Sequence, residues 1–228
     1  MEEKINKILD RYNQNINDND RKLQISKLGK IKDPAVIPHL IDIYKKETDD
    51  ASMRNAAILA ISTTKIFTDE TLDALLVGID DKSEVVRRAV VMGLGKNKSP
   101  KGLPILLDKA KNDPSELVRG SSTWALGQLG LEEGLPILIE RCSDPHWVIR
   151  KTAAEGLGNF SPTPERVNLL INLMKNDSVE DVRKAAIRAL GQLKAKEALP
   201  DLKILIEKEK SANVRVEAKK VVKQLESS

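Results

Sequence analysis

A string of about ten residues recurs along this chain every 31 to 33 residues, and a repeat of that length constrains the fold more than any other feature. Its clearest copy spans residues 86–95 (Val-Arg-Arg-Ala-Val-Val-Met-Gly-Leu-Gly), and similar strings begin at Val118, Ile149 and Val182. A fixed period in this range is the signature of stacked units that bury their apolar faces against their neighbours. The arginine of each copy is found at Arg21, Arg54, Arg87, Arg119, Arg150, Arg183 and Arg215.

Each unit reads as two helices joined by a short turn. The second helix is the Val-Arg string, and we expect the glycine near its end to adopt the left-handed conformation of a helix C-cap. The first helix is typified by residues 103–110 (Leu-Pro-Ile-Leu-Leu-Asp-Lys-Ala), where proline lies in the first turn and its missing N–H costs nothing. No segment shows the sustained alternation of a strand. The sequence predicts one domain over 1–228, in repeats of roughly 1–31, 32–66, 67–98, 99–130, 131–161, 162–194 and 195–228.

The composition indicates an aliphatic core. Hydrophobic residues make up 40% of the chain but aromatic residues only 3%, so Leu, Ile, Val and Ala must fill the interior. Phe160 stands where other repeats carry Ile31 or Leu129, and we expect it in the core. One cysteine, Cys142, excludes a disulfide framework. Two histidines leave little material for a metal centre, and we expect no metal site.

The turn aspartate, the Val-Arg pair and the closing Ala-Leu-Gly resemble the HEAT-like repeats of the phycobilisome-lyase type, the short form of the HEAT family. The resemblance covers about residues 2–225 and is strongest in the four central repeats. Tetratricopeptide and ankyrin repeats have similar lengths, but their Trp-Leu-Gly-Tyr and Thr-Pro-Leu-His signatures are absent. The resemblance implies an all-α, right-handed α-solenoid, with the first helices outside and the second helices lining a concave face.

The end repeats carry signs of capping. The fifth residue after the Val-like position is apolar or small in six repeats, for example Ile58 and Ile187, and becomes Lys219 in the last one. Terminal repeats need a polar outer face because no neighbour covers them. We therefore expect a self-capped array rather than a piece of a longer one.

Motifs for catalysis or phosphate binding are absent from the sequence. It has neither a phosphate-binding glycine loop nor a Gly-x-Ser-x-Gly elbow. HEAT-like deoxyhypusine hydroxylases carry His-Glu pairs that bind two irons, whereas here His39 precedes Leu40 and His146 precedes Trp147. Cys142 is expected to be a packing residue; its spacing from His146 leaves a nucleophile as the less favoured alternative. We expect no catalytic residue and no cofactor.

The seven arginines could bind phosphate, but a structural role explains them better. One arginine per repeat, paired with an aspartate in the preceding turn, is what a ladder of ion pairs and hydrogen bonds between repeats needs. The same aspartates suit the start of the second helix. We therefore expect the arginines to form a ladder with Asp81, Asp113, Asp144 and Asp177.

The variable positions of the second helices are the candidate binding face. Trp124 and Trp147 come from adjacent repeats and could face one another across the groove. Ordinary packing is the alternative, but aliphatic residues already fill the core positions, and tryptophan is enriched at binding hot spots. The expected partner-binding residues are Leu59, Val85, Arg88, Met92, Leu117, Ser121, Trp124, Trp147, Lys151, Glu155 and Arg188.

These patterns favour a non-catalytic scaffold that binds another protein or peptide on its concave face. The resemblance adds a bilin lyase, or a protein that binds a bilin or a phycobiliprotein, as the alternative. Nucleic-acid binding through the lysines of the last repeats is weaker, because glutamates are interspersed there and no ring follows Phe160 to stack bases. The net charge is only +4, and no stretch of the sequence resembles a signal peptide or a membrane span. We expect a cytoplasmic monomer.

Overall fold

The computed structural model describes residues 1–14, 17–66 and 68–227. Residues 15–16 of the expected first turn, Phe67 at the start of the expected third repeat, and Ser228 lie outside the described residues. The chain divides into two compact units, Met1–Leu106 and Leu107–Ser228, and the division falls within one helix. The prediction of a single domain stays a prediction.

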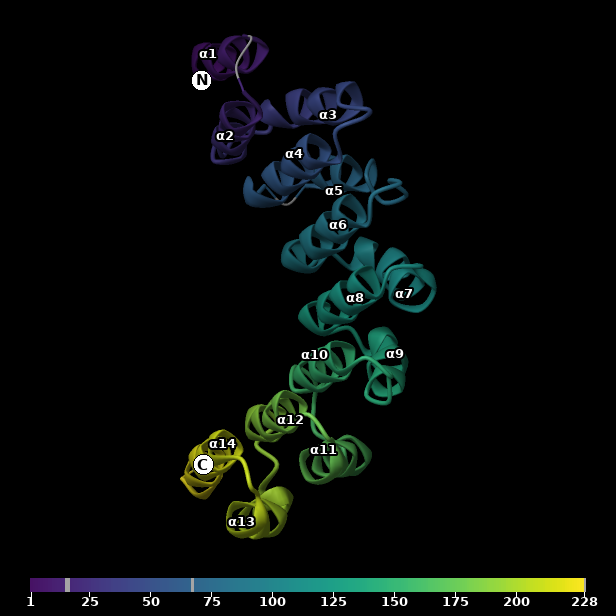
Figure 1. Cartoon of the computed structure of the whole chain (residues 1–228), viewed down its shortest axis with the longest axis vertical. Coiled ribbons are helices and arrows are strands. Elements are labelled where there is room, and N and C mark those ends of the chain that lie inside the picture. Colours follow the sequence, from purple (N-terminus) through teal and green to yellow (C-terminus); the bar gives the residue numbers. More distant parts are fainter. Residues whose placement is uncertain (15–16, 67, 228) are drawn as a thin grey trace. The chain divides into compact units, whose positions relative to one another are not determined.

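The described residues form α-helices and short 3₁₀ turns, with no strand among them, which confirms the all-α prediction (Figure 1). Pairs of helices follow one another with the predicted period. The first helices of the repeats are α1 (Glu2–Asn13), α3 (Val36–Lys46), α5 (Asp69–Leu76), α7 (Leu103–Asn112), α9 (Leu135–Arg141), α11 (Pro164–Asn176) and α13 (Leu199–Lys208). The second helices are α2 (Asp18–Gly29), α4 (Ala51–Thr63), α6 (Glu84–Asn97), α8 (Glu116–Leu129), α10 (Trp147–Leu157), α12 (Glu180–Gln192) and α14 (Ala212–Glu226).

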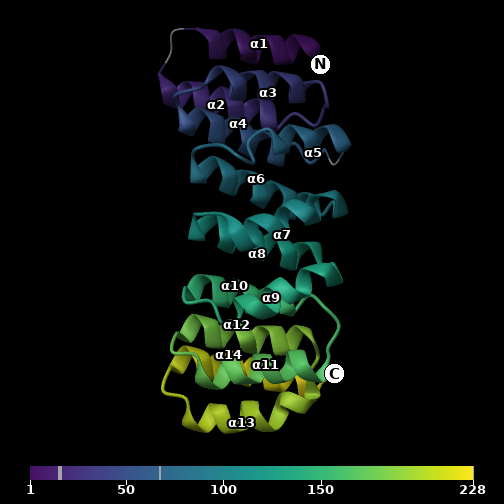
Figure 2. The same ribbon diagram turned by 90° about the vertical axis from the view of Figure 1, so that its right-hand side faces the viewer.

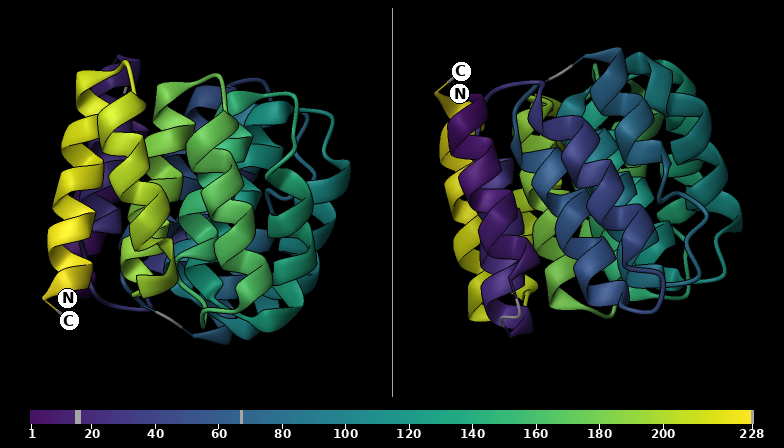
Figure 3. Two further views of the ribbon diagram at one scale, coloured as in Figure 1. Left: turned by 90° about the horizontal axis from the view of Figure 1, so that it is seen from below. Right: turned by 90° about the horizontal axis from the view of Figure 1, so that it is seen from above.

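Within each unit the helices pack in two layers. In unit 1, α2, α4 and α6 contact one another in order, and α3 packs on α4 (Figure 2). In unit 2, α8, α10, α12 and α14 form the corresponding row, with α9, α11 and α13 packed against it (Figure 1). The last two helix pairs are seen side by side in the left view of Figure 3. This is the α-solenoid arrangement of paired helices that the repeat predicts.

The core is aliphatic, as the composition predicts. Leucine, isoleucine, valine and alanine supply most of the buried side chains, and Tyr12 and Phe160 are the only buried rings among the described residues. Ile58 and Ile187, at the fifth position after the Val-like residue, are buried, whereas Lys219 at that position is exposed. Burial of this kind supplies about 25 cal/mol per Å² of apolar surface.

The prediction for the glycines was wrong. Gly95 and Gly127 were expected to be left-handed C-caps, but α6 and α8 continue two residues beyond them. The left-handed residues that end these two helices are Lys98, with φ of 55°, and Gly130, with φ of 68°. Gly158 also has a right-handed helical backbone, with φ of −64°.

Close approach of neighbouring helices explains the glycines instead. A Cβ on Gly127 would lie 2.6 Å from the Cα of Gly156 on the next second helix. A Cβ on Gly29 would lie 2.8 Å from the Cα of Ala60. No side-chain movement can relieve contacts with a backbone atom, so these positions require glycine to let the second helices touch.

Polar side chains of the next repeat bind carbonyl groups of glycines near the ends of two second helices. Asn159 donates to the Gly127 carbonyl at 2.9 Å, and Gln224 donates to the Gly191 carbonyl at 3.0 Å. Carbonyl groups in the last turn of a helix lack partners within the helix. The next repeat therefore caps the preceding second helix.

Candidate functional site

The expected partner-binding residues of unit 1 lie on α4 and α6. Leu59 and Val85 are exposed, although both are large and apolar. Arg88 is exposed, and Met92 is half-buried. Leu59 also lines a shallow groove between α2 and α4, with Lys22 and Ser26 on the opposite side.

The remaining expected residues lie on three consecutive second helices of unit 2. Leu117, Ser121 and Trp124 share one face of α8, because they are spaced four and three residues apart. Leu117 is 45% exposed, whereas Ser121 and Trp124 are half-buried. The other four residues lie on α10, which carries Trp147, Lys151 and Glu155, and on α12, which carries Arg188.

The two tryptophans do not lie level with each other. Gly127 and Gly156 meet where α8 and α10 touch. Trp124 precedes Gly127 by three residues and is therefore level with Ala153 on α10. Trp147 lies six residues before Ala153, which is about 9 Å along the helix axis. The structure therefore does not support the expectation that the two rings face one another.

Leu117 is instead the neighbour of the N-terminal end of α10. Glu116, the residue before it, lies 3.5 Å from the imidazole of His146, the residue that precedes α10. Trp147 and Val148 follow at once and are 38% and 37% exposed. We call Leu117, Trp147 and Val148 the apolar patch. Of its members, Leu117 and Trp147 are among the partner-binding residues expected from the sequence.

The charged residues beside the apolar patch are largely paired. The Lys151 ammonium lies 3.8 Å from the Glu155 carboxylate, and the Arg188 guanidinium lies 3.2 Å from that of Glu217. Lys184 lies 2.7 Å from Asp181 on the same helix. The hydrogen bond from Lys184 lowers the pKa of the Asp181 carboxyl. Paired charges of this kind favour a solvated surface over a basic tract.

The arginines of the Val-Arg strings connect consecutive repeats. Arg150 donates through Nη1 to the carbonyl oxygen of Asp144, six residues earlier, at 2.8 Å. Its Nε and Nη2 donate to the Asp177 carboxylate of the following repeat, at 2.7 and 3.0 Å. The aspartate in the preceding turn thus accepts through its backbone, and the carboxylate comes from one repeat further on. The same geometry joins Arg54 to Asp81 and Arg183 to Glu209, and Arg21 donates to Glu47 through Nη2.

The ladder is not uniform. Asp144 accepts a hydrogen bond from Arg141 at 3.2 Å, three residues before it. For the other three arginines, the hydrogen-bond acceptors described are carbonyl oxygens of the preceding turn. They are Asp81 and Lys82 for Arg87, Asp113 and Pro114 for Arg119, and Glu209 and Lys210 for Arg215.

Two tyrosines that sequence reasoning did not assign complete the ladder in unit 1. Tyr44 on α3 donates to the Asp81 carboxylate at 2.9 Å, beside the bonds from Arg54. Tyr12 on α1 donates in the same way to Glu47 at 2.5 Å. Burial and the hydrogen bond to Asp81 raise the pKa of Tyr44 to about 12. In the sequence, the only sign of this role is that a tyrosine precedes the arginine by nine or ten residues in these two repeats.

The ladder carboxylates predict a loss of stability in acid. Burial alone would raise the pKa of Asp81, but the hydrogen bonds from Arg54, the Ser83 N–H and Tyr44 hold it below its ordinary value. The pKa of Asp177 is lowered in the same way, with Arg150 as the main donor. A lowered folded-state pKa stabilises the fold above the unfolded value, near pH 4, and this contribution disappears as the pH falls through the folded value. We expect the free energy of unfolding, measured in urea, to fall steadily below about pH 4.

A matched variant checks the cause. Asp177→Asn should be less stable at neutral pH and should lose less stability in acid than the wild-type chain, because it no longer takes up that proton. An unchanged slope would exclude Asp177 as a source of the pH dependence.

Cys142 is only 2% exposed, and burial raises the pKa of its thiol to about 12. The thiol is therefore protonated at neutral pH and is a poor nucleophile. Among the described residues, no cluster of His, Cys, Asp or Glu could hold a metal ion. Their helices include none with the length and apolar character that crossing a membrane requires.

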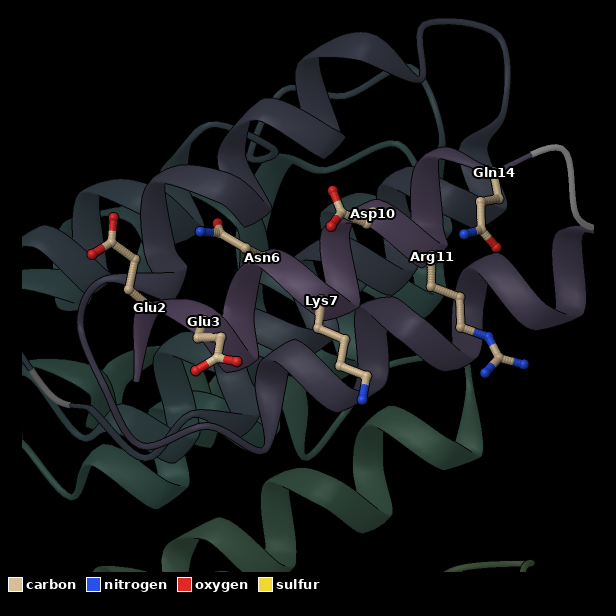
Figure 4. Close-up of a pocket in the computed structure, with 7 residues that line it drawn as sticks. All are labelled: Glu2, Glu3, Asn6, Lys7, Asp10, Arg11 and Gln14. Atoms are coloured by element: carbon tan, nitrogen blue, oxygen red, sulfur yellow. The ribbon is translucent and has the colours of Figure 1, made fainter.

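A pocket on unit 1 has its lining residues on one helix. Glu2, Glu3, Lys7, Asp10 and Arg11 are among the side chains that project from the exposed side of α1 (Figure 4). Six of the seven lining residues belong to α1 and the seventh, Gln14, is its C-cap, so no wall from a second element is defined there. Mixed charges along one exposed helix face are typical of a solvated surface.

Comparison with known proteins identifies the family. A family model for HEAT repeats matches residues 72–158 and 135–223, which together are more than half of the chain. The chain therefore belongs to the HEAT repeat family.

Among curated proteins, protein YibA of Escherichia coli K12 is 32% identical over 95 residues, which are 42% of this chain and 33% of YibA. Deoxyhypusine hydroxylase of Eremothecium gossypii is 36% identical over 66 residues, 29% of this chain and 20% of the hydroxylase. The chain thus spans a third or less of the length of the curated relatives it matches.

Solved structures show the same fold. The Escherichia coli YibA structure matches with a TM-score of 0.64 at 21% identity, covering 98% of this chain and 82% of that one. The complex of CpcE and CpcF of phycocyanin lyase from Nostoc sp. PCC7120 matches with a TM-score of 0.59 at 19% identity, covering 93% and 91%. A HEAT-like repeats protein of Thermococcus onnurineus NA1 matches with a TM-score of 0.56 at 18% identity, covering 94% and 99%.

Proposed function

We propose that this chain is a non-catalytic scaffold that binds another protein or peptide on the second-helix face of unit 2. The observation that carries the proposal is the apolar patch. Single exposed apolar side chains are common on protein surfaces, but Leu117, Trp147 and Val148 lie at the N-terminal ends of two neighbouring helices. An exposed tryptophan beside aliphatic side chains is typical of the centre of a binding site.

The surroundings of the patch support a binding role over a catalytic one. Charged groups of α10 and of α12 are paired within each helix, Lys151 with Glu155 and Lys184 with Asp181. The thiol of Cys142 is buried and protonated. The second helices are fixed by close backbone contacts and by the arginine ladder, so the surface is preformed. A preformed surface binds without the entropy cost of ordering a loop.

The test is the capture of partner proteins by patch variants. Leu117→Glu and Trp147→Glu should each reduce capture from an extract of the source organism by about tenfold or more, since losing a hot-spot side chain costs about 2 kcal/mol. The melting temperature should change little, because both side chains are exposed. The captured proteins are identified by mass spectrometry and compared between the wild-type chain and each variant.

Ile139→Glu is the matched control. Ile139 is 44% exposed and lies on α9, a first helix of the same unit. The Ile139→Glu variant should capture the same partner proteins as the wild-type chain. Equal capture by the wild-type chain and both patch variants would refute the proposed site, and loss of capture with Ile139→Glu would place the binding surface on the first helices.

Binding of a bilin or a phycobiliprotein is the second candidate. The similarity to the CpcE–CpcF complex covers nearly all of the chain and supports it at the level of fold. Cys142 is unsuitable as a covalent anchor because its thiol is buried, so such binding would depend on the rings of Trp124 and Trp147 and on Arg88 or Lys151. A phycobiliprotein among the captured partners would favour this candidate. Nucleic-acid binding is the weakest of the candidate functions. We also propose that the protein is monomeric and cytoplasmic.

A further inference from the structure

A pocket lined by lysines lies in unit 1, at the C-terminal ends of two second helices. Ser62 and Thr63 at the end of α4, Lys65 just beyond it and Lys96 in the last turn of α6 line a space of about 450 Å³. The two helices are held together here, because a Cβ on Gly93 of α6 would lie 2.5 Å from the hydroxyl oxygen of Ser62. The pocket is therefore built between two packed helices.

The charge around this pocket is not balanced as it is for Lys151, Lys184 and Arg188 of α10 and α12. Lys65, Lys96 and Lys98 are exposed. Within the described part of the chain, none of these three forms an ion pair with a carboxylate, whereas nearby Lys101 pairs with Asp69 at 2.5 Å. Lys65 and Lys96 thus bring two positive charges to one end of the α4–α6 pair, and Lys98 follows as the C-cap of α6.

Backbone conformation makes two of these lysines unusual. Lys65 and Lys98 have φ of 57° and 55°, in the left-handed region that favours glycine. Lys98 follows α6 just as Gly130 follows α8, and each donates its N–H to the carbonyl four residues earlier. Glycine is therefore the lower-strain choice at this position, and the lysine side chain needs another explanation.

The helix dipole explains only part of the pattern. A lysine near a helix C-terminus is stabilised by the partial negative charge of the last carbonyl groups. That charge is about half an electron per helix, so two helix ends do not neutralise three ammonium groups.

The remaining groups of the pocket indicate which anion fits. The hydroxyls of Ser62 and Thr63 donate to the carbonyl oxygens of Ile58 and Ala60, at 3.0 and 2.9 Å. These hydroxyls therefore have no proton left to donate to a phosphate oxygen. The residues that line the pocket include no aromatic ring or guanidinium that would recognise a nucleotide. Ammonium groups above aliphatic stems suit a carboxylate side chain with apolar neighbours.

We propose that this lysine pocket, lined by Ser62, Thr63, Lys65 and Lys96 with Lys98 just beyond α6, docks an acidic peptide segment of a partner protein. The site is separate from the apolar patch of unit 2, and it does not depend on the proposed function. Binding is electrostatic and therefore weakens as salt rises.

The test uses fluorescence anisotropy with a labelled oligo-glutamate peptide at low salt. The wild-type chain should bind the peptide. Lys65→Gly combined with Lys98→Gly should raise the Kd about three- to tenfold, because each exposed ion pair contributes modestly. The double variant should melt no lower than the wild type, because glycine relieves the left-handed backbone.

Lys194→Gly is the control for charge and backbone. Lys194 has φ of 55° and lies in unit 2, so the substitution makes the same change away from the lysine pocket. It should leave the Kd unchanged. The proposal is overturned if the wild type does not bind the peptide, if Lys194→Gly weakens binding as much per charge removed, or if single-stranded DNA of equal charge binds more tightly.

Discussion

Replacing Arg54 by alanine should lower the free energy of unfolding by about 3–5 kcal/mol, the cost of breaking a buried ion pair on one side. Arg54 is only 4% exposed and donates four hydrogen bonds. Two reach the Asp81 carboxylate, at 2.7 and 2.9 Å, and two reach the carbonyl oxygens of Glu47 and Thr48. Alanine would leave a buried carboxylate with Tyr44 as its remaining side-chain donor.

The size of this effect should depend on the carboxylate and not on the arginine alone. Arg215 occupies the same position in the last repeat and donates to the carbonyl oxygens of Glu209 and Lys210. We expect Arg215→Ala to cost only about 1 kcal/mol, typical of a hydrogen bond near the surface. Urea unfolding of both variants gives the comparison. Equal losses would mean that the ion pair between repeats adds nothing beyond the turn contacts.

Introducing a methyl group at Gly127 should also destabilise the chain strongly. The added Cβ would lie 2.6 Å from the Cα of Gly156, so α8 and α10 must separate. Overpacking of a close contact costs about 1–3 kcal/mol, and we expect Gly127→Ala near the upper end because backbone must move. The bond from Asn159 to the Gly127 carbonyl should lengthen as well.

Gly134→Ala is the matched control. At Gly134 an added Cβ meets Leu126 at 3.5 Å, an ordinary contact, and the backbone φ is −79°. This variant should stay within about 0.5 kcal/mol of the wild type in urea unfolding. If Gly127→Ala were equally mild, the close approach would not be what requires glycine there.

The repeat was readable from the sequence because each unit presents the same residues at the same positions. The arginine spacing located seven helix pairs, and the scarcity of rings indicated an aliphatic core. The glycines show where such reasoning fails. A sequence shows that a residue without a side chain is required, but a left-handed turn and a close helix contact require it equally.

The hydrogen-bond partners of the ladder arginines could not be predicted from the sequence either. Asp144 and Asp177 have the same spacing from their arginines, yet Asp177 accepts from Arg150 of the preceding repeat and Asp144 from Arg141. The geometry that decides between them comes from how consecutive repeats stack. The same stacking offsets Trp124 from Trp147 along the helix axes and places Glu116 beside His146, a neighbour that lies 30 residues away in the sequence.

Photo-cross-linking at the apolar patch tests the central claim most directly. A benzoylphenylalanine introduced at Leu117 in the source organism should form cross-links to a partner protein, and the same group at Ile139 on α9 should not. Cross-links from the Leu117 position that identify one partner would support a scaffold that binds on the second-helix face. Cross-links only from the Ile139 position, or from neither position, would contradict it.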